Sequence, residues 1–225
     1  CPPHFYAHGH NPQYRHFGKL MHYLNRVCHL TNGGLHIAPA ALLYHGEAEW
    51  TGSCMHIQKP ARELLEHQID FDILPSDLFA DMSTFKASFD GKLHVNGETY
   101  RALIIPYAQY VTKAVASFAA GAVKEGFEVI FIDALPDGIS DCSNEAGNSS
   151  LLAGLKGCSV VPLRSLSDHL DRKRIREVKI SIPFERLRYY HYRHEHDIYM
   201  FSNEDPGIAY EGDITVPASG NAVLY

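Results

Sequence analysis

Short apolar runs alternate with helical patterns through the middle of the 225-residue chain. Uninterrupted apolar runs between turn residues are typical of strands that are buried on both faces of a parallel sheet. Strands separated by crossover helices predict a doubly wound α/β fold of three layers, α/β/α, and we expect five parallel strands in flavodoxin-like order. The expected strands are 40–44, 71–74, 102–105, 127–132 and 159–162, and the expected helices are 60–69, 111–124 and, from a weaker pattern, 149–155.

An amphipathic helix is predicted before this region and short strands after it. Apolar residues recur at helical spacing from Tyr14 to Cys28, behind Asn11 as an N-cap and ahead of Gly33-Gly34. After Arg174 a period of two predicts an antiparallel β appendage with strands at 177–182, 187–193, 197–201 and 212–216. Within the α/β region, Asn96-Gly97 is a strong hairpin signal.

These patterns divide the chain into three parts. Residues 1–36 are interpreted as the loop and last helix of a preceding domain, 37–174 as the flavodoxin-like domain, and 175–225 as the β appendage or the start of a β-sandwich. The chain begins at Cys1 and stops within a strand-like segment, so we expect it to be cut from a larger protein.

Composition excludes several functional classes. The formal charge is −6 and no apolar run reaches membrane-spanning length, so neither nucleic acid nor a membrane is an expected partner. The five cysteines lack metal-binding spacing and are expected to be reduced, and the 15 histidines are scattered over the chain, which favours many separate roles over one metal cluster. We expect no cofactor and no metal.

Ligand sites in open α/β sheets form beyond the carboxyl ends of the strands. The loop after the first strand contains Glu47, Glu49 and Trp50, the only tryptophan. Two carboxylates beside an indole are suited to acid–base chemistry or to sugar binding. The alternative is an exposed acidic loop whose tryptophan packs against the next helix. The loop after the central strand has no Ser or Cys nucleophile, and the chain contains no nucleophile-elbow or nucleotide-binding motif.

Three other segments are candidates for binding. His10 and Asn11 precede the first helix among aromatic residues and offer hydrogen bonds to a polyhydroxylated ligand. His194 and His196 would share one face of a strand, with a solvated hairpin end as the alternative to a metal site. The polar segment 140–150 is interpreted as a mobile surface loop, with a phosphate nest as the less favoured alternative.

Several of these segments together carry a resemblance to a known class of protein. The sequence resembles the region that follows the catalytic (β/α)8 barrel in large bacterial glycoside hydrolases. The segments that carry this resemblance are, in order, residues 9–15 with Asn25-Arg26, then 41–50, 71–79 and 100–106. The family 42 β-galactosidases and the family 106 α-L-rhamnosidases are the similar types. Residues 197–204 look like the opening of the β-sandwich that follows in such proteins.

The resemblance implies a class I glutamine-amidotransferase-like domain without amidotransferase chemistry, whose parent enzyme carries its catalytic acids upstream. It therefore implies a non-catalytic accessory domain that shapes an active-site rim, where it meets carbohydrate within the full enzyme, or mediates homo-oligomerisation. Separately, we expect a cytoplasmic location. The substrate-binding residues would be His10, Asn11, Glu47, Glu49 and Trp50, with none catalytic. Two alternatives stay open, a self-contained small α/β hydrolase that uses Glu47 or Glu49, and a carbohydrate-binding module.

Overall fold

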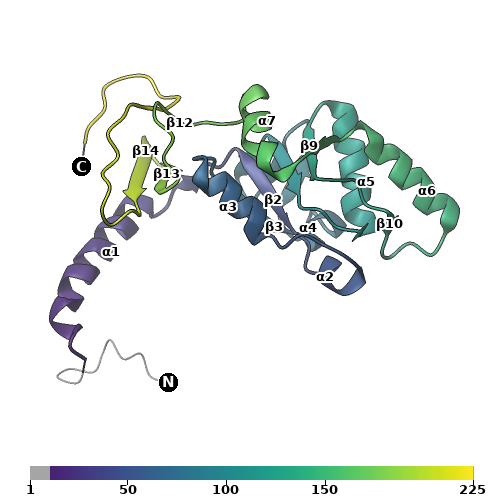
Figure 1. Ribbon diagram of the computed structural model, residues 1–225, viewed down its shortest axis with the longest axis horizontal. Coiled ribbons are helices and arrows are strands. Elements are labelled where there is room, and N and C mark those ends of the chain that lie inside the picture. The colour runs from purple at the N-terminus through teal and green to yellow at the C-terminus, as the bar shows by residue number, and fades with distance from the viewer. Residues whose placement is uncertain (1–10, 225) are drawn as a thin grey trace.

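The computed structural model describes residues 11–224 and has a five-stranded parallel sheet at its centre (Figure 1). The strands lie in the order β3-β2-β7-β9-β11, and each pair of neighbours is parallel. All five strands were expected from their apolar runs, and the ends agree within one residue. Their bounds are β2 (Ala40–Tyr44), β3 (Phe71–Pro75), β7 (Ala102–Ile105), β9 (Glu128–Ile132) and β11 (Ser159–Val161).

Helices cover both faces of this sheet, which gives the three expected layers (Figure 1). Successive side chains of a strand point to opposite faces, so Ala41 and Leu43 of β2 join one apolar core while Ala40 and Leu42 join the other. The first core is covered by α4 (Asp77–Ala80), α5 (Lys113–Ala122) with η3 (Val123–Glu125), and α6 (Glu145–Gly154) with η4 (Leu155–Gly157). The second is covered by α3 (Gln58–Glu66) and by η5 (Leu163–Ser165) with α7 (Leu166–Arg172).

A small antiparallel sheet interrupts the alternation before β7. It consists of β4 (Ala87–Phe89), β5 (Leu93–Val95) and β6 (Glu98–Tyr100). The predicted hairpin is confirmed, since Asn96 and Gly97 connect β5 to β6 with φ of 49° and 97°, the left-handed conformations of a type I′ turn. A further short parallel pair joins β8 (Tyr110–Val111) to β10 (Gly138–Ile139).

A strand from before the parallel sheet and two strands from after it form a second antiparallel sheet. The order is β1-β13-β14, so β1, which precedes the parallel sheet in the chain, pairs with a strand that follows it. The C-terminal strands confirm the predicted period-two pattern. The bounds are β1 (Leu35–His36), β13 (Leu187–Arg193) and β14 (Asp197–Asn203), with a separate pair of β12 (Lys179–Ile180) and β15 (Ile214–Thr215).

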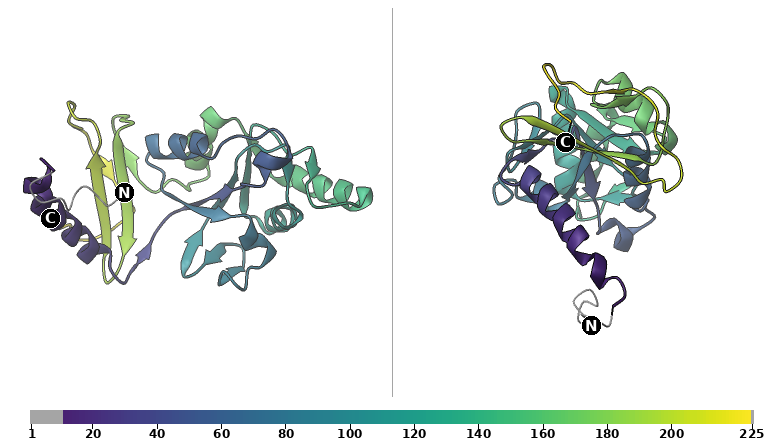
Figure 2. Two further views of the ribbon diagram at one scale, coloured as in Figure 1. Left: turned by 90° about the horizontal axis from the view of Figure 1, so that it is seen from below. Right: turned by 90° about the vertical axis from the view of Figure 1, so that its left-hand side faces the viewer.

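The N-terminal helix starts later than expected. The 3-10 turn η2 (Tyr14–His16) precedes α1 (Phe17–Thr31), whose N-cap position is occupied by His16 and not by Asn11. The end of α1 meets the second sheet, and the rest of the helix extends away from the body of the molecule (Figure 2). Among the described residues, no helix is both long and apolar enough to cross a membrane.

The segment 140–150 was wrongly expected to be a loop throughout. Its second half forms the start of α6, because the side-chain oxygen of Asn144 accepts a hydrogen bond from the Ala146 amide at 3.1 Å and caps the helix. Cys28, Cys54, Cys142 and Cys158 are free, as expected.

Candidate functional site

The loops after β2 and β7 occupy the place where ligands bind in open α/β sheets. The chain leaves β2 for β3 on one side and later places β7 on the other side of β2. This reversal of direction is a topological switch point, and crevices form beyond the carboxyl ends of the two strands that flank it. The expected ligand loop, 45–52, and the loop after the central strand, 106–109, both begin here.

Backbone hydrogen bonds join these two loops to each other. The Met55 amide donates to the Tyr107 carbonyl at 2.7 Å, and the Gln109 amide donates to the Ser53 carbonyl at 2.8 Å. The Gln109 side-chain oxygen also accepts from the Ser53 amide at 3.2 Å. Residues 53–55 therefore run alongside the turn that follows β7, which carries Tyr107 and Gln109.

His45 is the buried titratable residue of this region and was not expected to matter. It follows β2 directly and is only 6% exposed. Burial lowers the pKa of His45 and outweighs backbone hydrogen bonds at Leu43 and Met55, so the imidazole is neutral at pH 7. Its Nδ1 atom is buried without a hydrogen-bond partner. Only the placement of His45 at the end of a predicted strand pointed to it in the sequence.

Glu47, Glu49 and Trp50 form a tip at the same end of the sheet, in which Glu47 is half-buried and the other two are exposed. Glu47 occupies the N-cap position of the single-turn helix α2 (Ala48–Thr51). The Glu49 carboxylate lies 3.6 Å from Nδ1 of His56, and both side chains face solvent. The indole of Trp50 is 90% exposed, so the alternative in which Trp50 packs against the next helix is wrong. The tip can offer carboxylate acceptors and an aromatic face to a ligand.

The other expected binding residues lie elsewhere. His10 is outside the described residues. Asn11 accepts a hydrogen bond from the Gln13 amide at 2.9 Å with its side chain and one from the Tyr14 amide with its carbonyl, and these bonds order the turn before η2. Figure 1 shows α1 and α2 on opposite sides of the parallel sheet, so the structure does not bring Asn11 and the Trp50 tip together.

His194 and His196 are not on a strand as expected. They belong to the turn between β13 and β14, where the His194 amide donates to the His196 carbonyl at 3.1 Å. Both side chains are exposed. The alternation of a strand therefore does not apply to them, and the solvated hairpin end is the correct alternative.

A polar cluster at the opposite, amino end of the sheet was missed by the sequence analysis. Its members are His36 of β1, Asp70 and Asp72 around the start of β3, and Glu98 and Tyr100 of β6. Imidazole Nε2 lies 2.7 Å from Asp70 Oδ2, and Nδ1 lies 3.0 Å from Asp72 Oδ1. The Tyr100 hydroxyl lies 3.0 Å from Asp72 Oδ2 and 2.8 Å from Glu98 Oε2.

The charges of this cluster hold His36 in its protonated form. Burial alone would lower the pKa of His36, but hydrogen bonds and charge attraction from Asp70 and Asp72 raise it to about 10. The ring also stacks on Tyr190 at a centroid distance of 4.3 Å and an interplanar angle of 5°. The five residues are spread over three elements, and no spacing along the sequence indicates that they meet.

No family model and no curated protein matches the chain. Solved structures that resemble it in part include two glycoside hydrolases. Alpha-L-fucosidase isoenzyme 2 from Paenibacillus thiaminolyticus is 13% identical with a TM-score of 0.45, over 83% of this chain and 41% of that one. The apo exo-carrageenase GH42 from Bacteroides ovatus is 9% identical with a TM-score of 0.41, over 80% of this chain and 28% of that one. The chain thus spans less than half the length of either glycoside hydrolase.

Proposed function

We propose that this chain is a non-catalytic accessory domain of a carbohydrate-active enzyme, with a flavodoxin-like, glutamine-amidotransferase-like fold. Its tip of Glu47, Glu49 and Trp50 would contact carbohydrate at the rim of an active site carried by another part of the protein. The strand order supports the fold, because β3-β2-β7-β9-β11 is the order 2-1-3-4-5 of flavodoxin-like sheets.

The exposure of Trp50 is the observation that carries the functional proposal. An indole has about 200 Å² of largely apolar surface, and water contact with that surface is unfavourable. At 90% exposure, almost none of it is covered within this chain. A flat aromatic face flanked by hydrogen-bond acceptors is suited to the apolar face and the hydroxyls of a sugar ring.

The loops at the switch point support a non-catalytic role. An amidotransferase or hydrolase of this fold needs a nucleophile on a sharp, open turn after the central strand. Here that turn carries Tyr107, and the backbone of its neighbours is paired with residues 53–55. A glycosidase needs two carboxyl groups across one glycosidic bond, with one of them held protonated. Glu49 is exposed and Glu47 is only half-buried, so neither lies in an enclosed site of this kind.

A fluorescence titration tests the proposal directly, since Trp50 is the only tryptophan of the chain. We expect galactose, L-fucose or L-rhamnose to change the indole emission saturably, with a dissociation constant on the order of 1 mM. Glu49→Gln keeps the fluorophore and should weaken binding several-fold. Glu145→Gln, on exposed α6, is the matched control and should bind as the wild type does. Saturable changes with none of these sugars would contradict a carbohydrate-binding tip.

Kinetics of the intact enzyme separate rim binding from catalysis. A rim contact is made equally in the ground and transition states, so Trp50→Ala should raise KM several-fold and leave kcat nearly unchanged. Because the indole makes few packing contacts within this chain, Trp50→Ala should change the free energy of unfolding by less than about 0.5 kcal/mol. A large fall in kcat at constant KM would instead give the tip a catalytic role. A fall in thermal stability without a kinetic effect would make Trp50 a packing residue.

The same exposure favours a second candidate, a carbohydrate-binding module that acts alone. The two functions differ in where affinity resides. A module binds sugar as an isolated chain with the affinity of the whole protein, whereas a rim domain gains at least tenfold when the rest of the active site is present. Fluorescence titrations of the isolated chain and of the intact enzyme distinguish them.

A further inference from the structure

Three side chains at the amino end of the parallel sheet are arranged as metal ligands. Nδ1 of His36, a carboxylate oxygen of Asp72 and one of Glu98 all lie within 4.8 Å of one another. We propose that these three residues bind one divalent transition-metal ion of the zinc type. One imidazole and two carboxylates are ligands that Zn²⁺ and its neighbours accept, whereas Ca²⁺ and Mg²⁺ prefer oxygen alone.

The count of protons shows that this position lacks positive charge. The Tyr100 hydroxyl has one proton and faces carboxylate oxygens of both Asp72 and Glu98 within 3.0 Å. It can donate to only one of them at a time, so two acidic side chains share a single donor. A cation bound by Asp72 and Glu98 would oppose the repulsion between the two carboxyl groups.

The count of charges leads to the same conclusion. Asp70, Asp72 and Glu98 place three acidic side chains around the single imidazole of His36 in a partly buried place. Among the ion pairs of residues 11–224, these three carboxylates meet no Lys or Arg. A divalent ion bound by His36, Asp72 and Glu98 would supply positive charge among these acidic side chains.

The surroundings of His36 match those of metal-binding histidines. Such histidines donate their second ring N–H to a carboxylate, which fixes the tautomer and raises the basicity of the coordinating nitrogen. Asp70 accepts from Nε2 at 2.7 Å, and this bond leaves Nδ1 directed to Asp72. The stacked Tyr190 ring holds the imidazole plane. Ligand atoms around a four-coordinate zinc lie about 3.3 Å apart, so side-chain movements of about 1 Å complete the site.

The ion would connect three strands that belong to three different sheets. His36 belongs to β1, which pairs with β13 of the second sheet. Asp72 lies on β3 at the edge of the parallel sheet, and Glu98 lies on β6 of the small antiparallel sheet that precedes β7. A bound ion therefore connects β1, which pairs with the second sheet, to the α/β body. This site is independent of any sugar at the Trp50 tip, which lies at the opposite end of the parallel sheet.

Titration of the EDTA-treated chain with CoCl2 and ZnCl2 tests this site. We expect one equivalent of Co²⁺ to bind with visible ligand-field bands of an N/O environment, Zn²⁺ to displace it, and Zn²⁺ to raise Tm. Glu98→Gln removes one ligand from a partly exposed position and should weaken binding at least tenfold. Circular dichroism checks that Glu98→Gln is folded, and Asp72→Asn provides a second ligand variant.

Two controls separate this site from the other histidines. His94→Gln changes a half-buried residue of the neighbouring strand β5, outside the proposed ligand set, and should bind Co²⁺ as the wild type does. The double variant His194→Gln/His196→Gln removes the exposed pair in the β13–β14 turn and should also retain one equivalent. The absence of saturable binding by the wild type, full binding by folded Glu98→Gln, or loss of the site in the double variant would each overturn the proposal.

Discussion

At the scale of single residues, histidines between two carboxylates are the main polar feature of the second sheet and its junction. His191 of β13 is 1% exposed, with Nδ1 at 2.9 Å from Glu177 and Nε2 at 3.0 Å from Asp197. Its ring stacks on Tyr199, and Arg193 shares Asp197. His191 thus repeats the arrangement of His36 with one difference, because here an arginine supplies a further positive charge. The scattered histidines were expected to have many separate roles, and these two fit that expectation.

His191 should make stability depend on pH. Burial lowers its pKa, but the bonds to Glu177 and Asp197 prevail and raise it above the ordinary value of 6.5. A group whose pKa is raised in the folded state contributes stability that is full below pH 6.5 and declines as the pH rises through the folded pKa. His191→Gln leaves Glu177 with a buried, unpaired charge and should cost about 3 kcal/mol at pH 6. The cost should be smaller at pH 9.

Urea unfolding with EDTA present, at pH 6 and pH 9, measures this effect. His94→Gln is the control, because solvent screens its pair with the exposed Asp90, so the substitution should change stability little at either pH. An equal cost of His191→Gln at both pH values would mean that the residue acts through packing alone.

At the scale of elements, the second sheet depends on a close approach at Gly34. The Gly34 amide donates to the Tyr192 hydroxyl at 2.7 Å, next to the pairing of β1 with β13. A Cβ at this position would collide with the Arg193 carbonyl and the Tyr192 ring. Gly121 offers the opposite case, since it is exposed in α5 and a Cβ there meets no atom within 4 Å.

We therefore expect opposite effects of the same substitution at the two glycines. Gly34→Ala should destabilise by about 2 kcal/mol through overpacking, and amide exchange should increase in β1. Gly121→Ala should stabilise by about 0.5–1 kcal/mol through helix propensity. Thermal unfolding of both variants checks the signs. If Gly34→Ala were as stable as the wild type, the segment before β2 would have to rearrange at no cost in stability.

The elements that the sequence predicted are those with strong local signals. Residues 102–105 form an uninterrupted apolar run, and all four are fully buried in β7. Helix α7 was missed because its seven residues contain only Leu166 and Leu170 as apolar positions. The polar clusters could not be predicted from the sequence, for a different reason. Asp70 lies 34 residues from His36 and Glu98 lies 28 residues beyond Asp70, so only the paths of β1, β3 and β6 bring them together.

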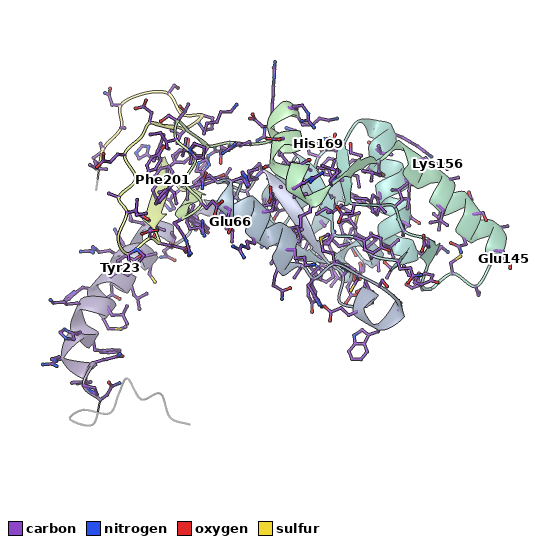
Figure 3. All side chains as sticks on the ribbon, viewed as in Figure 1. Tyr23, Glu66, Glu145, Lys156, His169 and Phe201 are labelled. Carbon is purple, nitrogen blue, oxygen red and sulfur yellow. The ribbon has the colours of Figure 1, made fainter. Side chains whose placement is uncertain are left out.

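At the scale of the whole molecule, the helix α1 is poorly covered by the rest of the described chain. None of its residues is buried, and Leu20, Tyr23 and Leu24 are 44%, 52% and 40% exposed. These three residues recur at helical spacing and form a continuous apolar stripe. Tyr23 lies on α1, which stands apart from the parallel sheet (Figure 3). An apolar stripe of this kind is typical of a surface that another protein segment covers.

We propose that the isolated chain covers this stripe with a second copy and forms a dimer or larger oligomer. Each leucine that is removed from water contributes about 1.5–3 kcal/mol, and a charge in the interface opposes that gain. Leu24→Glu should therefore shift the mass measured by light scattering to that of a monomer. Asn25→Glu introduces the same charge on the neighbouring side of the helix, outside the stripe, and should leave the oligomer intact. A wild-type chain that stays monomeric at high protein concentration would refute self-association. An oligomer that is unchanged in Leu24→Glu would place its interface elsewhere than on α1.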